Sequence, residues 1–180
     1  MAAKRINIKD KTFEIFVEEA TIQKAVEGVA KKLSDDYADK NPVFVVVLNG
    51  AFVFAADVFK HLDFPCQISF TKFSSYIGTT SSGTITEQLP VTEDITGRHV
   101  VVIEDIVETG YSMEYLLKRL KDRNPASLEV CALAFRKSKC KVKDMDIKYI
   151  AMDLPEAFVV GYGFDYDQVG RQMRDIYALV

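Results

Sequence analysis

The sequence VVVIEDIVETGYS, residues 100–112, decides the fold. It begins with three valines and an isoleucine, which run without polar alternation into the acidic pair Glu104 and Asp105. An uninterrupted β-branched run predicts a strand that is buried on both faces, as in a parallel sheet. Because ligands bind beyond the carboxyl ends of such strands, the two acids lie where a functional site is expected.

A helix is predicted directly after this strand. Its apolar stripe recurs at helical spacing and consists of Met113, Leu116, Leu117 and Leu120. Thr109, Gly110 and Ser112 at the helix entry leave backbone N–H groups accessible to a ligand. A helix N-terminus of this kind is typical of phosphate-binding sites.

Three acids lie close together at the end of the strand, namely Glu104, Asp105 and Glu108. Acids before a helix are common in α/β proteins and can serve only to solubilise a turn. Like charges repel at this spacing, however, unless a hydrated cation or a hydroxyl-rich ligand shares the site. The crowding favours a functional interpretation over the structural one.

The rest of the chain repeats the pattern of strand and helix. Val43–Leu48 is a second continuous apolar run, and the turn Asn49-Gly50 leads into another apolar-faced helix. An earlier helix is expected to have Thr21 as its N-cap. Further strands are predicted at 67–73, 128–135, 149–154 and 158–163. Together these elements predict an α/β fold with an open, mostly parallel twisted sheet flanked by helices.

Composition narrows the class of protein. With 180 residues, 48% hydrophobic residues and a net charge of −3, the chain is expected to form one domain, 1–180. The absence of a long basic run argues against nucleic acid as a partner. No segment is typical of a signal peptide or a membrane span, so no membrane partner is expected. Cys66, Cys131 and Cys140 lack metal-binding spacing, which favours free thiols and a cytoplasmic location.

Residues 100–112 closely resemble the phosphoribosyl pyrophosphate (PRPP) loop of type I phosphoribosyltransferases, specifically of the hypoxanthine-guanine branch. The resemblance covers residues 20–171. It implies that Glu104 and Asp105 hold the ribose hydroxyls and a magnesium ion, and that Glu108 is the catalytic acid. The other residues implied to bind the ribose and the 5′-phosphate are Ile106, Val107, Thr109, Gly110, Tyr111 and Ser112.

The resemblance also implies contacts to pyrophosphate. Asn49 and Gly50 match a turn that contacts pyrophosphate and often contains a non-proline cis peptide bond, and Arg171 matches a residue that reaches the same group. A flexible β-hairpin lid that excludes water is implied at about 74–90. The lid residues that match the family are Ser75 and Tyr76.

The purine is implied to lie under a small hood, formed by residues from about 150 to 180 and the N-terminal segment. Phe158 matches the aromatic residue that stacks on the base, and the backbone at Val159 matches the one that reads its edge. Arg136 matches a cation that contacts the exocyclic oxygen of a 6-oxopurine. Asp165 matches a residue that holds a second magnesium ion through water.

Four positions depart from the family pattern. Relatives usually carry a cation at Asn49, aspartate at Glu108, lysine at Arg136 and an aromatic residue at Gly170. The extra methylene of Glu108 moves its carboxylate by about 1.5 Å if the backbone stays in place. Such a shift can cost roughly a hundredfold in rate unless the loop adjusts.

The resemblance implies transfer of the 5-phosphoribosyl group from PRPP to N9 of hypoxanthine, and of guanine, with magnesium as cofactor. Arg136 only donates hydrogen bonds, so adenine is expected to be a poor substrate. A homodimer or homotetramer is implied. The alternatives are a nucleotide-sensing regulator with the same fold, a transferase that prefers xanthine, and a purely structural subunit.

Overall fold

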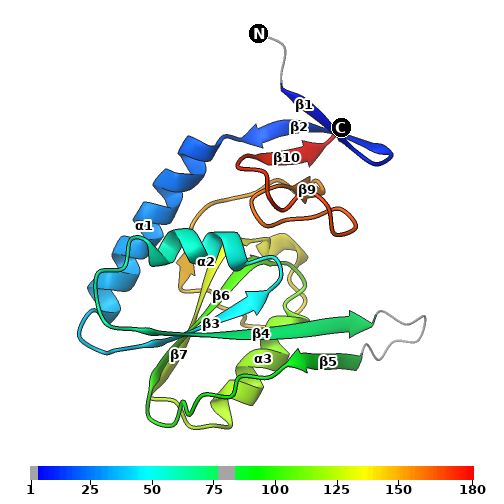
Figure 1. Cartoon of the computed structure of the whole chain (residues 1–180). Helices are drawn as coiled ribbons and strands as arrows, with labels where there is room; N and C mark the ends of the chain where they lie inside the picture. Colours follow the sequence, from blue (N-terminus) through cyan, green and yellow to red (C-terminus); the bar gives the residue numbers. More distant parts are fainter. Residues whose placement is uncertain (1–3, 77–83) are drawn as a thin grey trace.

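The structure is a computed structural model that describes residues 4–76 and 84–180 (Figure 1). Its main sheet has six strands in the order β5-β4-β3-β6-β7-β8, and all neighbours are parallel except β4 and β5. The strands are β3 (Val43–Leu48), β4 (Gln67–Tyr76), β5 (Thr84–Leu89), β6 (His99–Val107), β7 (Ser127–Phe135) and β8 (Tyr149–Ile150). The predicted α/β fold with a mostly parallel sheet is therefore confirmed.

Helices cover both faces of this sheet. They are α1 (Glu19–Tyr37), α2 (Phe52–Phe59) and α3 (Tyr111–Lys121). Along β6, Val101 and Ile103 belong to the core cluster shared with α1 and α2, whereas Val100 and Val102 belong to the cluster shared with α3. Alternate residues of a strand point to opposite faces, so the uninterrupted apolar run fills both cores.

The predicted N-cap of α1 is wrong. The helix begins at Glu19, with Glu18 at the N-cap position, so Thr21 already lies within its first turn. The carboxylate of Asp175 accepts a hydrogen bond from the backbone N–H of Glu19 at 2.9 Å. A residue at the other end of the chain therefore supplies the cap, which makes a local capping residue unnecessary.

A second sheet brings the two ends of the chain together (Figure 1). It is antiparallel, in the order β1-β2-β10-β9, and its strands are β1 (Arg5–Ile8), β2 (Lys11–Val17), β9 (Val159–Val160) and β10 (Ile176–Leu179). The strands predicted at 149–154 and 158–163 shorten to two residues each, since the chain leaves the sheet to form loops. A short 3₁₀ turn, η1 (Lys137–Lys139), follows β7.

Most of the described part of the predicted lid belongs to strands β4 and β5. Tyr76 of β4 pairs with Thr84 of β5 in antiparallel register, and residues 77–83 between them lie outside the described part of the chain. Ser75 of β4 pairs in the same way with Ile85. In the described ranges no helix combines the length and the apolar character needed to cross a membrane.

Candidate active site

The carboxyl ends of β3 and β6 bring the turn after β3 against the acids of β6. A Cβ atom placed on Gly50 would lie 1.6 Å from Oδ2 of Asp105, so only glycine leaves room for this carboxylate where it stands. The peptide bond between Leu48 and Asn49 is cis, as the resemblance implied. Asn49 itself is exposed. The sheet thus places the predicted pyrophosphate turn beside a predicted ribose-binding acid.

Glu104 and Asp105 are partly buried and make hydrogen bonds mainly with their own backbone. Oε1 of Glu104 accepts the N–H of Asp105 at 3.0 Å, and Oδ1 of Asp105 accepts the N–H of Ile106 at 2.6 Å. No Lys, Arg or His within 4–76 and 84–180 forms an ion pair with either carboxylate.

This environment disfavours the charged forms of both acids. Loss of solvent, with the adjacent charge of Asp105 as the second cause, raises the pKa of Glu104 well above its ordinary value. Loss of solvent also raises the pKa of Asp105, although hydrogen bonds and the charge of Arg171 act in the opposite direction. Two adjacent acids of this kind are suited to share a cation or the hydroxyl groups of a ligand.

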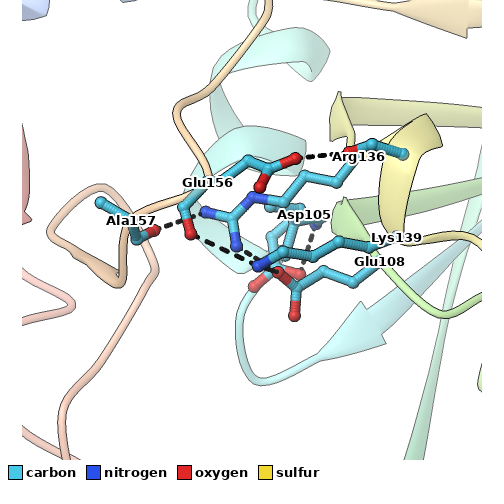
Figure 2. A network of polar contacts seen from close by, with 8 residues as sticks. Asp105, Glu108, Arg136, Lys139, Glu156 and Ala157 are labelled. Carbon is cyan, nitrogen blue, oxygen red and sulfur yellow. Dashed lines mark hydrogen bonds and ion pairs between the residues drawn. The ribbon is translucent and has the colours of Figure 1, made fainter.

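Unlike Glu104 and Asp105, Glu108 lies beside positively charged side chains (Figure 2). Nη1 of Arg136 donates to Oε1 of Glu108 in a short ion pair, and Nη2 of Arg136 donates to the carbonyl oxygen of Ala157 at 2.8 Å. Arg136 is only 8% exposed. One guanidinium group therefore links the loop after β6 to the backbone beside Phe158.

A pocket of about 130 Å³ joins these groups. Its lining consists of Asp105, Ile106, Glu108, Arg136, Phe158, Val159, Phe164 and Asp165. Every residue in this lining except Phe164 is among the predicted site residues, although the residues come from three distant segments of the sequence. The pocket combines carboxylates, one buried cation and an aromatic wall, as a planar heterocycle that accepts and donates hydrogen bonds requires.

The start of α3 lies beside these acids in sequence and offers backbone donors. Gly110 is its N-cap residue, with φ of 85°, and has no side chain with which to cap the first turn. A Cβ on Gly110 would approach Sγ of Cys140 to 3.1 Å. Lys141 N–H also donates to the carbonyl oxygen of Thr109 at 2.9 Å, so the loop that follows η1 holds this turn from behind. Tyr111 and Ser112 are exposed.

Val107, in contrast, is a core residue. Its side chain is 3% exposed and belongs to the cluster shared with α3. Its carbonyl oxygen accepts the backbone N–H of Arg136 at 2.9 Å. Within the predicted loop, Val107 therefore supports the fold and the position of Arg136.

The loop between β9 and β10 lies against the turn after β3. A Cβ on Gly163 would lie 2.2 Å from the carbonyl oxygen of Gly50, and its φ of +99° also favours glycine. Arg171 donates to the carbonyl oxygen of Gly163 at 2.6 Å and forms an ion pair with Asp165 at 2.6 Å. The two predicted residues Arg171 and Asp165 are thus brought together.

Phe158 forms an exposed aromatic surface in the pocket. It is 45% exposed, and its ring lies edge-on to that of Tyr166 at 5.9 Å and tilted to that of Phe13 at 6.3 Å. The hydroxyl of Tyr166 donates a hydrogen bond to the carboxylate of Asp10 at 2.8 Å. This bond links the three aromatic rings to the turn between β1 and β2. The N-terminal strands therefore help to hold the ring of Phe158 in place through Phe13 and Tyr166.

Sequence reasoning missed two residues at the site, one beside Glu108 and one in the lining of the pocket. Lys139, which the sequence did not single out as a site residue, has its Nζ 3.7 Å from Oε1 of Glu108. A turn with three residues per repeat places Lys139 on the same side as Arg136, but the sequence carried no clear signal for that turn. Phe164 lines the pocket, and nothing in the sequence separated it from a core aromatic residue.

Comparison with known proteins agrees with this geometry. The family model described as "Phosphoribosyl transferase domain" matches residues 16–168. The chain belongs to the phosphoribosyltransferase family.

Its relatives within this phosphoribosyltransferase family share most of its length. A hypoxanthine-guanine-xanthine phosphoribosyltransferase of Tritrichomonas foetus is 41% identical over 84% of this chain and 83% of its own. A hypoxanthine-guanine phosphoribosyltransferase of Streptococcus pneumoniae is 37% identical over 92% of both chains. A crystal structure of a hypoxanthine-guanine phosphoribosyltransferase of Bacillus anthracis has a TM-score of 0.87 and 31% identity, covering 97% of this chain and 100% of that chain.

A Trypanosoma cruzi hypoxanthine phosphoribosyl transferase, studied for the role of its C-terminal region in oligomeric state and activity, also has a TM-score of 0.87. It is 33% identical and covers 97% of this chain and 95% of its own.

The donor set at the acid pair fits magnesium supplied with a phosphate-bearing substrate. In the ranges that the structure describes, no group of three or more His, Cys, Asp or Glu side chains is arranged to hold a metal ion by itself. Magnesium in proteins usually keeps several water molecules and binds through one or two carboxylates together with substrate phosphates. Glu104 and Asp105, which lack a cationic partner among the described residues, provide such a partial set.

Proposed function

We propose that this phosphoribosyltransferase transfers the 5-phosphoribosyl group from PRPP to N9 of hypoxanthine or guanine and releases pyrophosphate. One observation carries the proposal: Glu108, Arg136 and Phe158 line one pocket beside the acid pair of β6. A proton acceptor, a donor-only cation and an aromatic wall match the N7–H, the 6-oxo oxygen and the face of a 6-oxopurine. The names of the relatives support the same substrates.

The phosphoribosyl end is proposed to lie along β6 and the start of α3. Glu104 and Asp105 hold the ribose hydroxyls and a magnesium ion, and the backbone from Thr109 to Ser112 holds the 5′-phosphate. When bound, magnesium neutralises charge that develops on the pyrophosphate leaving group. Asn49, Gly50 and Arg171 are proposed to face that group, with Asp165 beside them.

Two charged side chains are proposed to recognise the purine base. As N9 attacks the sugar, Glu108 accepts the proton from N7 of the purine, and its Oε2 makes no hydrogen bond with the described residues. Arg136 donates to the 6-oxo oxygen. Adenine carries an amino group there, so a donor would face a donor and discrimination follows.

Xanthine is a second candidate base. The T. foetus relative, at 41% identity, carries xanthine in its name as well as hypoxanthine and guanine. Xanthine also has a 6-oxo oxygen, which Arg136 suits equally well. Its additional 2-oxo group would be recognised by the backbone near Val159.

The assembly and location are proposed on separate grounds. The chain is proposed to be one domain, with a lid at about 74–90 and a hood built from β9, β10 and the N-terminal strands. A homodimer or homotetramer is proposed from the family. In the described chain Cys66, Cys131 and Cys140 are all free, which supports a reducing cytoplasm.

A product assay tests the proposed function. PRPP and magnesium are supplied with hypoxanthine, guanine, xanthine or adenine in parallel, and nucleotide and pyrophosphate are quantified. We expect turnover with hypoxanthine and guanine, and at least about a hundredfold lower kcat/KM with adenine. Comparable rates with adenine would contradict the role of Arg136, and no turnover with any base would favour a nucleotide-binding regulator.

A matched pair of variants locates the proton acceptor. Glu108→Gln is expected to lower kcat about a hundredfold or more and to leave PRPP affinity nearly unchanged, because its amide accepts protons poorly. Glu114→Gln, an equivalent change on exposed α3, serves as the control. Unchanged turnover in Glu108→Gln would remove Glu108 from the catalytic role.

A further inference from the structure

Two cations converge on one oxygen of Glu108 (Figure 2). Nη1 of Arg136 donates to Oε1, and Nζ of Lys139 lies 3.7 Å from the same atom. Oε2 has no hydrogen-bond partner among the described residues. The carboxylate of Glu108 is thus held through Oε1, while Oε2 stays available to accept a proton.

In the proposed complex with a base, Arg136 would have to donate to the 6-oxo oxygen as well as to Glu108. Its guanidinium already serves Glu108 and the carbonyl oxygen of Ala157, while Nε is buried and makes no hydrogen bond within the described chain. A guanidinium has five N–H donors in one rigid plane, so turning them toward a 6-oxo oxygen weakens the geometry toward Glu108. The proton acceptor would then lose its main partner when it is needed.

We propose that Lys139 is a positioning residue that keeps the carboxylate of Glu108 anchored while Arg136 reads the base. This inference rests on the proposed function. Lys139 does not line the base pocket, and it acts through Oε1 of Glu108. Asp105 and Asp165 are the other carboxylates that line the pocket, so a second cation near Glu108 also offsets their repulsion.

The turn η1 holds Lys139 where this role requires it. Lys139 N–H donates to the carbonyl oxygen of Arg136 at 2.9 Å, which closes the turn. Nζ of Lys139 also reaches the carbonyl oxygen of Glu156 at 3.3 Å, and Ser138 donates to the carboxylate of Glu156 at 2.6 Å. Lys137 in the same turn is exposed and makes no ion pair with the residues described.

Lys137 therefore provides a matched control. Turnover of hypoxanthine is measured with labelled base for the wild-type chain, Lys139→Met, Lys139→Arg and Lys137→Met, and thermal unfolding checks that each variant is folded. We expect Lys139→Met to lower kcat about fivefold to tenfold with little change in KM for PRPP. Lys139→Arg should recover most of the rate, and Lys137→Met should stay within about twofold of wild type.

A double-mutant cycle separates positioning from a merely structural effect. In the Glu108→Gln background, Lys139→Met is expected to change kcat less than about twofold, because no carboxylate charge remains to be held. Equal losses in both backgrounds, an unchanged kcat in Lys139→Met, or an equal loss in Lys137→Met would each overturn the proposal. If the wild-type chain itself made no nucleotide, the proposed function would fail and this inference with it.

Discussion

The end of β6 and the middle of α2 both carry partly buried acids, but their surroundings differ. Asp57 of α2 accepts hydrogen bonds from Gln23 at 2.7 Å and from Tyr162 at 2.8 Å, and it pairs with Lys60 at 2.7 Å. Burial alone would raise the pKa of Asp57, yet these partners hold it below its ordinary value. Every oxygen of this carboxylate is occupied by the protein itself.

The acid pair Glu104 and Asp105 lies at the other extreme. Loss of solvent raises the pKa of Glu104 well above the ordinary value, and no cationic side chain in the described ranges forms an ion pair with either acid. A partnered acid such as Asp57 joins α1, α2 and the loop before β10, whereas an unpartnered pair adds no such link. The contrast shows that the protein itself satisfies the carboxylate of Asp57, and it supports the proposal that Glu104 and Asp105 bind a ligand.

The largest effect is expected from Asp105→Asn. Removing one charge of the pair should weaken binding of PRPP with magnesium by about a hundredfold or more, because a neutral amide is a poor ligand for a hard cation. Isothermal titration calorimetry measures this loss. The melting temperature without ligand should not fall, since repulsion within the pair is relieved.

Asp57→Asn is the matched control for that experiment. The chemical change is identical, but it falls in the partnered region, so PRPP affinity should stay within about twofold of wild type. If Asp105→Asn destabilised the ligand-free protein as much as Asp57→Asn, the contrast between ligand-binding and structural acids would be broken.

Gly50→Ala tests the same pair without altering a charge. The new Cβ would meet Oδ2 of Asp105 at 1.6 Å, and the flexible end of that side chain must move. We expect PRPP affinity to fall about tenfold to a hundredfold while the melting temperature changes by only a few degrees, because the carboxylate is displaced and the backbone is not. Full affinity in the variant would show that the observed position of Asp105 is not the one used in binding.

Much of the central sheet was predictable because its strands are buried on both faces. In residues 43–47 and 100–103, every side chain enters or packs against one of two cores, so the sequence shows an unbroken apolar run. β1 and β10 escaped prediction because they are short and depend on pairing with β2. The N-cap of α1 failed for the same reason, since Asp175 lies 156 residues beyond Glu19.

The candidate site also has parts that the sequence predicted and parts that it did not. The end of β6 and the loop after it were predictable because their acids, glycine and hydroxyl residues all lie within residues 104–112. The ion pair of Arg136 with Glu108 was not, since each was assigned a separate contact to the base and neither residue signals the other. Lys139 was missed because a basic run is usually solvated, and only the turn η1 directs one of its members inward.

Asp57→Asn should also lower stability, with a defined dependence on pH. The substitution removes the charged acceptor that Gln23, Tyr162 and Lys60 share. We expect this loss to lower the free energy of unfolding by about 2 kcal/mol. Because the pKa of Asp57 is lower in the folded state, its contribution is complete above the ordinary pKa of a carboxyl group and disappears as pH falls through the lowered value. Urea unfolding should therefore show a gap between wild type and variant at pH about 7 that closes in strong acid. If the difference in the free energy of unfolding did not change with pH, the loss of stability would come from packing and not from the charge of Asp57.

The smallest effect is expected at a site that belongs to neither region. Gly28 lies on the exposed face of α1, and a Cβ there would meet no atom within 4 Å. Gly28→Ala should raise the free energy of unfolding by about 0.5–1 kcal/mol, because alanine loses less conformational entropy in a helix. Urea unfolding measures the gain, and calorimetry should show unchanged PRPP affinity. A change in affinity would mean that α1 transmits its stability, through Gln23 and Asp57, to the acids of β6, so that the two regions are not independent.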